Sequence, residues 1–401
     1  MRQPFTSLGI LLLFSTSAPA QVPDVTASVV AQSWQYYGEV DGFRAYSFRT
    51  TICNIGDAPL DVDPYFDTPV VAKNLFRIAD GRIVQLGYGF PVVRVCALNE
   101  SSCGSCQATA CDTLGVGCAD TTSISDGSIG WGKWIIDANR GEWPVIPPGP
   151  SGDPPVLNGR IQVAIADVGI PGAIYVAENQ VVSGHDQQAG SGANNLSWRE
   201  VDLSNPTSPI NVGPTNVGEP AIFAWRAEHV GVLIDEASLV DEGGPGLHGT
   251  FWVASRATDL GNGRWRYDYA VQNTTSQVAA RGLRIPAPCG TGDLSNPQFF
   301  GVRHHSGSPF SNAPWSFNAG ANAMRWSTES FTANPDANAV RWGNLYAFSV
   351  ESDAPPHEAN ARVQLFEQPG TLRAKVLAPR PSPCHSPGTL NPSRSGPPIG
   401  P

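Results

Sequence analysis

The chain has 401 residues, 41% of them hydrophobic, and its formal net charge is −10 at pH 7. This length is sufficient for two or three domains with hydrophobic cores. An acidic chain without a basic stripe argues against nucleic acid and against anionic lipid surfaces as partners.

The first residues have the three parts of a secretory signal. Arg2 is followed by an apolar run at residues 8–14 and by the small residues Ala18 and Ala20. The apolar run is shorter than the roughly 20 residues that span a bilayer. We therefore expect a signal peptide at residues 1–20 and a secreted or periplasmic/extracellular protein without membrane insertion.

The cysteines predict disulfide bonds, because an even number of them outside the cytoplasm is typical of a disulfide framework. Five fall within residues 96–118, so at least one of these must pair elsewhere, with Cys53 as the best candidate, or stay free. A zinc or redox site at the C-x-x-C of residues 103–106 is less favoured, because zinc needs four close thiolates kept reduced and a redox motif needs a βαβ setting that is absent here. The eight are Cys53, Cys96, Cys103, Cys106, Cys111, Cys118, Cys289 and Cys384.

Period-two alternation bounded by Gly, Asn and Asp recurs along the chain and predicts β-strands. Strands at residues 34–40 and 43–53 flank the turn Asp41-Gly42, and strands at 251–257 and 264–272 flank residues 259–263. In the last strand, aromatic residues alternate with charged ones, which predicts one buried and one solvated face.

These patterns predict an all-β fold with two β-sandwich domains, immunoglobulin-like or jelly-roll-like. The first domain covers residues 21–212 and carries a Cys-rich insertion at residues 96–155. The second covers residues 213–378, after the Pro-containing segment 205–218, which is typical of a domain boundary. Residues 379–401 are rich in Pro, Ser and Gly and predict a disordered tail.

A short repeat lies in the second half. Residues 321–326 (Ala-Asn-Ala-Met-Arg-Trp) recur as residues 337–342 (Ala-Asn-Ala-Val-Arg-Trp). If both copies form adjacent strands, Arg325, Trp326, Arg341 and Trp342 lie together across a sheet, where they stabilise it by packing.

Two groups of residues have metal-ligand chemistry. His304 and His305 can converge on a metal from a loop, with Asp336, Glu329 or Asp353 as carboxylate partners, but a histidine that anchors its loop through backbone hydrogen bonds is the favoured interpretation. An acidic loop, in which Pro64 breaks any EF-hand spacing, suggests Ca²⁺ as a cofactor or else a solvated surface. Its residues are Asp57, Asp61, Asp63 and Asp67.

Three tryptophans, Trp131, Trp134 and Trp143, follow the cysteine cluster. Exposed indoles on a β-scaffold form stacking platforms for sugar rings, whereas buried ones fill a core, and burial is the favoured interpretation. The chain contains no Gly-x-Ser-x-Gly elbow, P-loop or dinucleotide fingerprint. The pair His185-Asp186 is adjacent in sequence, which suits an oriented acid–base pair poorly.

Several stretches resemble a family of large, uncharacterised secreted proteins of planctomycetes and other environmental bacteria. They are residues 44–56 with Thr50-Thr51-Ile52-Cys53-Asn54, residues 69–77, residues 114–118, His305-Ser306-Gly307 and residues 338–346. The resemblance implies secretion and no known activity. Members carry a histidine at the position of Thr68, a Lys-His-Gly-Phe element near residues 92–96, and further polar positions at Phe300, Gly301 and Ser308. Because this chain departs there, the resemblance implies that it keeps only His305 of any shared site.

The leading hypothesis is a secreted, non-catalytic β-sandwich protein of the cell envelope or extracellular matrix that acts by adhesion or binding. The first alternative is a metal-dependent extracellular enzyme, hydrolytic or oxidative, centred on His304 and His305. The second is a carbohydrate-binding protein that uses Trp131, Trp134 and Trp143. The sequence leaves the partner open, with a polysaccharide or an envelope component as the classes that suit this setting.

Overall fold

A computed structural model describes residues 21–62, 69–94, 96–123, 130–143, 149–245, 247–287, 293–320 and 322–381. Residues 1–20, Asp63, Asp67, Cys289, Cys384 and residues 382–401 of the expected tail lie outside the described residues. Strands dominate, and the described chain contains two short α-helices, α1 (Gly184–Gln188) and α2 (Ile222–Glu228). The described strand pairs are antiparallel, which confirms the all-β prediction.

Four larger sheets organise the chain. The first contains β1 (Val25–Val40), β2 (Phe43–Asn54), β7 (Ala119–Thr121) and β8 (Ile161–Ala164). The second has the order β11 (Ile210–Val217), β10 (Leu196–Asp202), β9 (Ile174–Val182), β4 (Val70–Ala79) and β5 (Arg82–Val93). The third has the order β12 (Leu233–Gly244), β13 (Leu247–Gly261), β14 (Arg264–Asn273), β19 (Asn344–Ser352) and β16 (Ser295–Phe300). The fourth has the order β17 (Ser316–Gly320), β18 (Ala323–Ser327), β15 (Ala280–Pro286), β20 (Pro356–Leu365) and β21 (Thr371–Pro379). A small ribbon pairs β3 (Leu60–Asp61) with β6 (Thr113–Leu114).

Both predicted hairpins form, and their turns explain why. Asp41 and Gly42, between β1 and β2, both have positive φ, 53° and 82°. Asn262 and Gly263, between β13 and β14, have φ of 53° and 74°. Two successive positive-φ residues make the tight turn whose twist matches paired strands, and Asp-Gly and Asn-Gly are the dipeptides that adopt it best.

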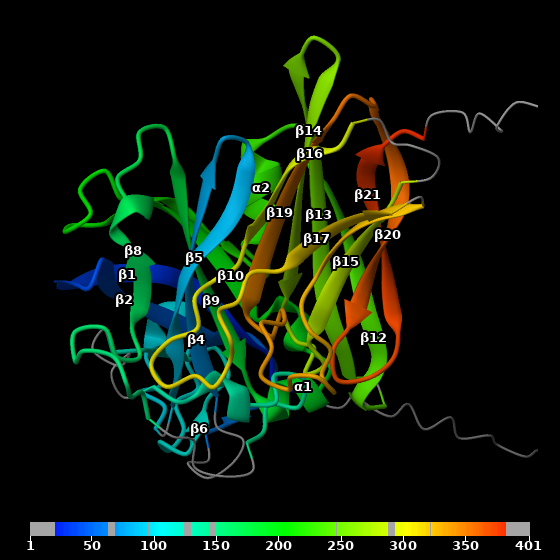
Figure 1. Cartoon of the computed structure of the whole chain (residues 1–401). Helices are drawn as coiled ribbons and strands as arrows, with labels where there is room; N and C mark the ends of the chain where they lie inside the picture. Colours follow the sequence, from blue (N-terminus) through cyan, green and yellow to red (C-terminus); the bar gives the residue numbers. More distant parts are fainter. Residues whose placement is uncertain are drawn as a thin grey trace, which may run out of the picture.

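The four sheets stack as successive layers, because residues that alternate along a strand enter different cores. In β4, Leu75 packs into the core under the first sheet, while Phe76 packs into the core shared with the third sheet. In β14, Ala270 faces that shared core, while Tyr269 faces the fourth sheet. Figure 1 shows α2 between the two halves, and Trp225 of α2 is buried in the shared core.

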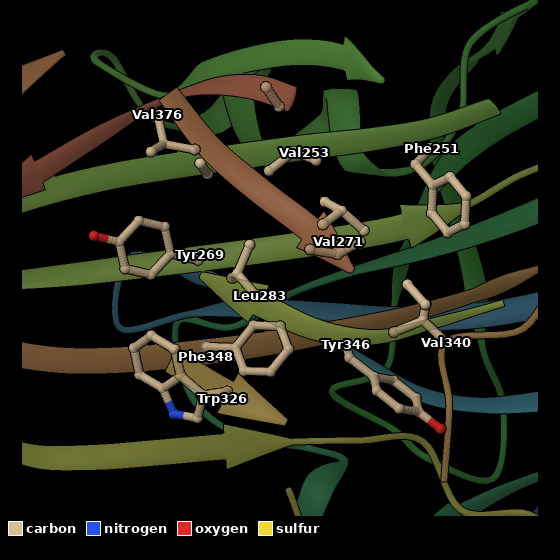
Figure 2. Packing of buried hydrophobic residues seen from close by; sticks show 14 of the residues in the cluster. Phe251, Val253, Tyr269, Val271, Leu283, Trp326, Val340, Tyr346, Phe348 and Val376 are labelled. Atoms are coloured by element: carbon tan, nitrogen blue, oxygen red, sulfur yellow. The ribbon is translucent and has the colours of Figure 1, made fainter. Parts of the chain in front are cut away.

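The largest core fills the space between the third and fourth sheets. Figure 2 shows Tyr269 and Phe348 of the third sheet facing Trp326 and Leu283 of the fourth. The ring centres of Trp326 and Phe348 lie 5.5 Å apart. Burial of such rings is a main source of folding free energy.

One prediction about β14 is wrong. Its charged face, expected to be solvated, packs against the first half of the chain, and the Asp268 side chain is 1% exposed. Asp268 makes ion pairs with Arg266 at 2.8 Å and with Arg82 of β5 at 3.6 Å. The alternation correctly indicated a strand with two different faces, but it could not reveal that a second sheet covers the polar face with matching charges.

The structure also places the expected boundary and the repeat. Residue 212 lies inside β11, which pairs with β10 of the second sheet. Residues 323–327 form β18, whereas the second copy of the repeat contributes an isolated bridge from Val340 to Ala280. Trp326 therefore enters the largest core, while Trp342 belongs to a separate cluster near residues 131–143, so the predicted side-by-side arrangement is wrong.

Three disulfides fasten the Cys-rich region, joining Cys53 to Cys103, Cys96 to Cys111 and Cys106 to Cys118. The expected pairing of Cys53 with the odd cysteine is confirmed. These bonds fit an extracellular protein. Within the described ranges, no helix has the length and apolar character needed to cross a membrane.

Candidate functional site

A cavity of about 270 Å³ opens where residues 133–134, the middle of β5, the loop around residues 304–310 and the segment 341–344 meet. Its walls combine aromatic rings with charged groups. The lining residues are Tyr88, Lys133, Trp134, Gln277, Val278, His304, Ser308, Phe310, Arg341, Trp342, Asn344 and Glu367. We refer to it below as the aromatic cavity. It brings together Trp134 and His304, which the sequence placed in two different candidate sites.

Lys133 belongs to the short 3₁₀ turn at Lys133–Ile135 and its side chain is buried. Its ammonium donates hydrogen bonds to the carbonyl of Gly343 and to Oδ1 of Asn344, both at 3.0 Å. The same nitrogen lies 4.7 Å from the ring centre of Tyr88 and 5.0 Å from that of Trp342. Cation–π contact of this kind is attractive and strengthens when the cation is desolvated.

Burial lowers the pKa of Lys133 to about 7, and the charge of Glu178 offsets only part of that effect. A buried ammonium loses its hydration, which favours the neutral amine. A lysine that is partly neutral near pH 7 is unusual, and such groups concentrate at functional sites.

Arg341 is the second cation that lines the cavity. Its guanidinium stacks on the ring of Phe310 at 3.5 Å and makes an ion pair with Glu367 at 3.3 Å. Its Nη2 donates to the carbonyl of Pro335 at 3.1 Å. The Nε of Arg341 is buried without a hydrogen-bond partner among the described residues. An unsatisfied buried donor costs free energy, so this nitrogen has a hydrogen bond left to give.

His304 is a buried residue of the cavity lining, and its hydrogen bonds connect several neighbouring segments. The Tyr346 hydroxyl donates to Asn338, so it accepts from Nε2 of His304 at 3.2 Å. The other nitrogen, Nδ1, lies 3.5 Å from the hydroxyl of Tyr88, and the backbone N–H donates to Asn312 at 2.7 Å. Burial lowers the pKa of His304 to about 3, so the ring is neutral at physiological pH.

His305 lies on the other side of the loop in a network with Ser306 and Asp153. Its Nε2 donates to the carbonyl of Tyr88 at 3.0 Å, and its Nδ1 lies 2.9 Å from the Ser306 hydroxyl. Ser306 donates its backbone N–H to Asp153 at 2.8 Å, and its hydroxyl accepts from the N–H of Gly159 at 2.9 Å. Burial lowers the pKa of His305 to about 4. This network ties residues 149–162 to the loop below the cavity.

The two histidines therefore serve separate networks. The carboxylate near His305 is Asp153, 4.0 Å from Nδ1, and not Asp336, Glu329 or Asp353. Across the described ranges, no group of three or more His, Cys, Asp or Glu residues is positioned to hold a metal ion.

The described members of the acidic loop also have separate partners. Asp57 accepts a hydrogen bond from the N–H of Val22 at 2.6 Å. Asp61 lies 3.3 Å from Nδ1 of His185. The neighbour of His185, Asp186, faces away and accepts from Val25 at 2.9 Å, so the adjacent His-Asp pair does not act as a unit.

The three tryptophans divide between core and cavity. Trp131 and Trp143 pack edge to face, with ring centres 5.3 Å apart, in a small core that also contains Trp342. Trp143 is 2% exposed. Trp134 is only partly buried and lines the cavity beside Phe310, whose ring centre is 6.4 Å away.

Behind Lys133, a buried polar seam joins the second and third sheets. The Glu178 carboxylate accepts hydrogen bonds from Asn74 and Gln272 at 2.8 Å and from the N–H of Ala221 at 2.6 Å. Gln85 continues the seam by donating to Asn74 at 3.1 Å. Burial raises the pKa of Glu178, although these hydrogen bonds oppose the shift. The seam fixes the position of the cavity relative to both halves.

A wider groove of about 450 Å³ lies on the other side of the loop that carries His304. Arg77 and Arg303 line it together with Phe43 and Phe299. Arg77 is paired with Asp167 at 2.7 Å, and Arg303 stacks on Phe43 at 4.4 Å. The described cations of this groove are thus already engaged.

Sequence reasoning missed Lys133, Arg341 and Glu367. The one available signal was the rarity of lysine, since Lys133 is one of three in the chain and precedes Trp134 directly. Nothing in the local pattern indicates that Arg341 and Glu367 form an ion pair. Arg341 lies in the loop before β19, and Glu367 follows the end of β20.

Comparison with known proteins gives little. No protein-family model and no curated protein matches the chain. Among solved structures, the chain is similar to the serine-rich repeat adhesion glycoprotein Srr1 of Streptococcus agalactiae, at 9% sequence identity and a TM-score of 0.23, with 84% of this chain and 89% of that chain covered. A TM-score this low assigns neither fold nor function, so the functional conclusion depends on the cavity itself.

Proposed function

We propose that this is a secreted binding protein of the cell envelope or extracellular matrix, and that the aromatic cavity holds its ligand. The observation that carries the proposal is the combination of Tyr88, Trp134, Phe310 and Trp342 with two cations in one cavity. Binding sites are typically concave and largely apolar, with a few polar groups that fix the orientation of the ligand.

The state of His304 argues against proton transfer by this histidine. His304 is neutral, and both of its ring nitrogens face tyrosine hydroxyls inside the protein. A general acid or base needs a pKa near the working pH and access to the reacting group. The pKa of His304 is far below that range and both of its ring nitrogens are engaged, so it positions Tyr88, which lines the cavity.

Carbohydrate is the ligand class that the aromatic wall favours. The apolar C–H faces of sugar rings stack on indole and phenol rings, and Trp134 is the partly exposed indole of this cavity. The signal-like residues 1–20, the three disulfides and the resemblance to uncharacterised secreted bacterial proteins all support an extracellular setting.

Binding of the full mature chain to bacterial extracellular polysaccharide, followed by tryptophan fluorescence, tests this proposal. Trp134→Ala is expected to weaken binding at least tenfold. Trp252→Ala is the control, since Trp252 packs on Phe223 at 4.9 Å and does not line the cavity. Unchanged binding by Trp134→Ala, or loss of binding with Trp252→Ala instead, would overturn the assignment of the cavity.

A further inference from the structure

When Lys133 is protonated, the aromatic cavity has a positive balance of charged side chains. Lys133 and Arg341 line it, against the single carboxylate of Glu367, and His304 is neutral. Arg341 makes an ion pair with Glu367. The Lys133 ammonium, by contrast, has no carboxylate within ion-pair distance among the described residues, and its contacts are with Gly343, Asn344 and aromatic rings. A low-dielectric cavity with excess positive charge favours an anionic group in its ligand.

Both cations also have donors to spare. The Lys133 ammonium uses two hydrogens on Gly343 and Asn344, and its third faces aromatic rings. Arg341 has its buried, unpartnered Nε. Two such donors match the oxygens of a carboxylate, and hydrogen bonds between charged groups are about twice as strong as neutral ones.

We propose that the aromatic cavity binds a uronic acid residue of an extracellular polysaccharide, with the sugar ring on the aromatic wall and its carboxylate on Lys133 and Arg341. This inference rests on the proposed function, and it adds the chemical class of the ligand. A neutral sugar would use the aromatic wall but would leave the Lys133 ammonium without a counter-charge.

Binding of a carboxylate should change the protonation of Lys133. A carboxylate beside Lys133 favours the charged ammonium, so the amine takes up a proton when the ligand binds. The charged and titratable groups around Lys133 are Glu178, Arg341, Glu367, Tyr88 and the two histidines His304 and His305. Their own hydrogen bonds and ion pairs hold them, whereas burial places the pKa of Lys133 at about 7, close to the pH of the experiment.

Calorimetry on the full mature chain tests the ligand class with four compounds. They are an oligogalacturonate, its methyl ester, a neutral galacto-oligosaccharide of the same length, and benzoate. We expect the oligogalacturonate to bind at least tenfold more tightly than the ester or the neutral sugar. At pH 7.5 its binding takes up protons, which shows as a heat that depends on the ionisation enthalpy of the buffer.

The repeat supplies a matched pair of variants. Arg341→Gln is expected to reduce oligogalacturonate affinity at least tenfold, while Arg325→Gln leaves it unchanged, since Arg325 binds Gln364 on the fourth sheet. Arg341→Lys, which keeps the charge, retains part of the affinity. Urea unfolding of each variant verifies that the fold is intact, and Lys133→Met abolishes the proton uptake.

Each outcome bears on a different claim. Equal binding of acid and ester would overturn the carboxylate while leaving a sugar site in place. Binding of benzoate without oligogalacturonate would overturn the polysaccharide source. If none of the four compounds binds but polysaccharide binding still depends on Trp134, the uronic acid is overturned as the ligand and the proposed function stands. Loss of that Trp134 dependence would overturn the proposed function.

Discussion

Lys133 and Trp342, which are 209 residues apart in the chain, contact each other in two ways. The Nε1 of Trp342 donates to the Lys133 carbonyl at 3.1 Å, and the Lys133 ammonium lies 5.0 Å from the centre of the Trp342 ring. This reciprocal contact joins the segment after the disulfide region to the start of β19. Because the cavity is built around it, the environment of Lys133 reports on the site as a whole.

The folded protein should become more stable as pH rises from 7.5 to 9.5. The pKa of Lys133 is about 7 in the folded state and near 10.5 in the unfolded state, so the unfolded chain binds more protons in this range. Stability then rises with pH, by about 2 kcal/mol over the two units. Urea unfolding at several pH values measures this slope.

The variant Lys133→Met should remove that slope, and Lys375→Met is its control because Lys375 is an exposed residue of β21 that does not line the cavity. The difference between wild type and variant isolates Lys133 from its neighbours. His304 and His305 are neutral in this range, and burial raises the pKa values of Tyr88 and Tyr346 above their usual range. An equal slope in wild type and Lys133→Met would show that the lysine is solvated.

Substitution of Ser306 should lower the free energy of unfolding for two reasons that different variants can separate. Its φ of 56° lies in the left-handed region, and its buried hydroxyl accepts hydrogen bonds from Gly159 and Gln162. Ser306→Ala is expected to lower the free energy of unfolding by about 1–3 kcal/mol, because buried donors lose their partner. Ser306→Gly should cost less, since glycine adopts positive φ freely. Ser316→Ala, at an exposed position, is the control; similar losses for all three variants would contradict this account.

Glu178 should not tolerate its amide analogue. Three donors converge on its carboxylate, so the NH₂ of Glu178→Gln would face a donor inside the seam. We expect a loss of about 1–3 kcal/mol of unfolding free energy. Glu200→Gln, on β10 and only partly buried, should change stability by less than about 0.5 kcal/mol. Denaturant unfolding of the two variants decides, and equal stability would mean that the seam is relaxed or hydrated.

The disulfides should differ in their contribution according to the loop that each closes. Cys53 and Cys103 are 50 residues apart, whereas Cys106 and Cys118 are 12 apart. The chain-entropy model predicts that replacing the first pair with serine costs about 1 kcal/mol more than replacing the second. Guanidinium unfolding of the two double variants measures the difference. A larger loss for the shorter loop would contradict the entropic explanation.

The parts of the fold that local chemistry determines could be predicted from the sequence. Asp41-Gly42 between two alternating segments predicts a tight hairpin, and an odd number of cysteines in one region leaves one to pair outside it, with Cys53 as the best candidate, or to stay free. The stacking of four sheets could not be predicted in this way. Whether Asp268 meets water or Arg82 depends on residues almost two hundred positions away.

The repeat shows the same limit for the site. The described residues of two nearly identical hexapeptides have different structures: the first forms β18 of a hairpin, whereas the second contributes an isolated bridge at Val340 and leads into Gly343, next to Lys133. Arg325 and Arg341 therefore have the same local sequence and different surroundings. Sequence reasoning found Trp134 and His304 as separate candidates, and only the tertiary contacts place them in one cavity.

Hydrogen–deuterium exchange with and without an oligogalacturonate most directly tests whether the aromatic cavity is the binding site. The account predicts slower exchange in residues 130–135, 304–310 and 337–345, with little change in β11 or in the strands of the first sheet. Protection confined to the groove around Arg77 and Arg303, or to the surface near Trp252, would contradict it.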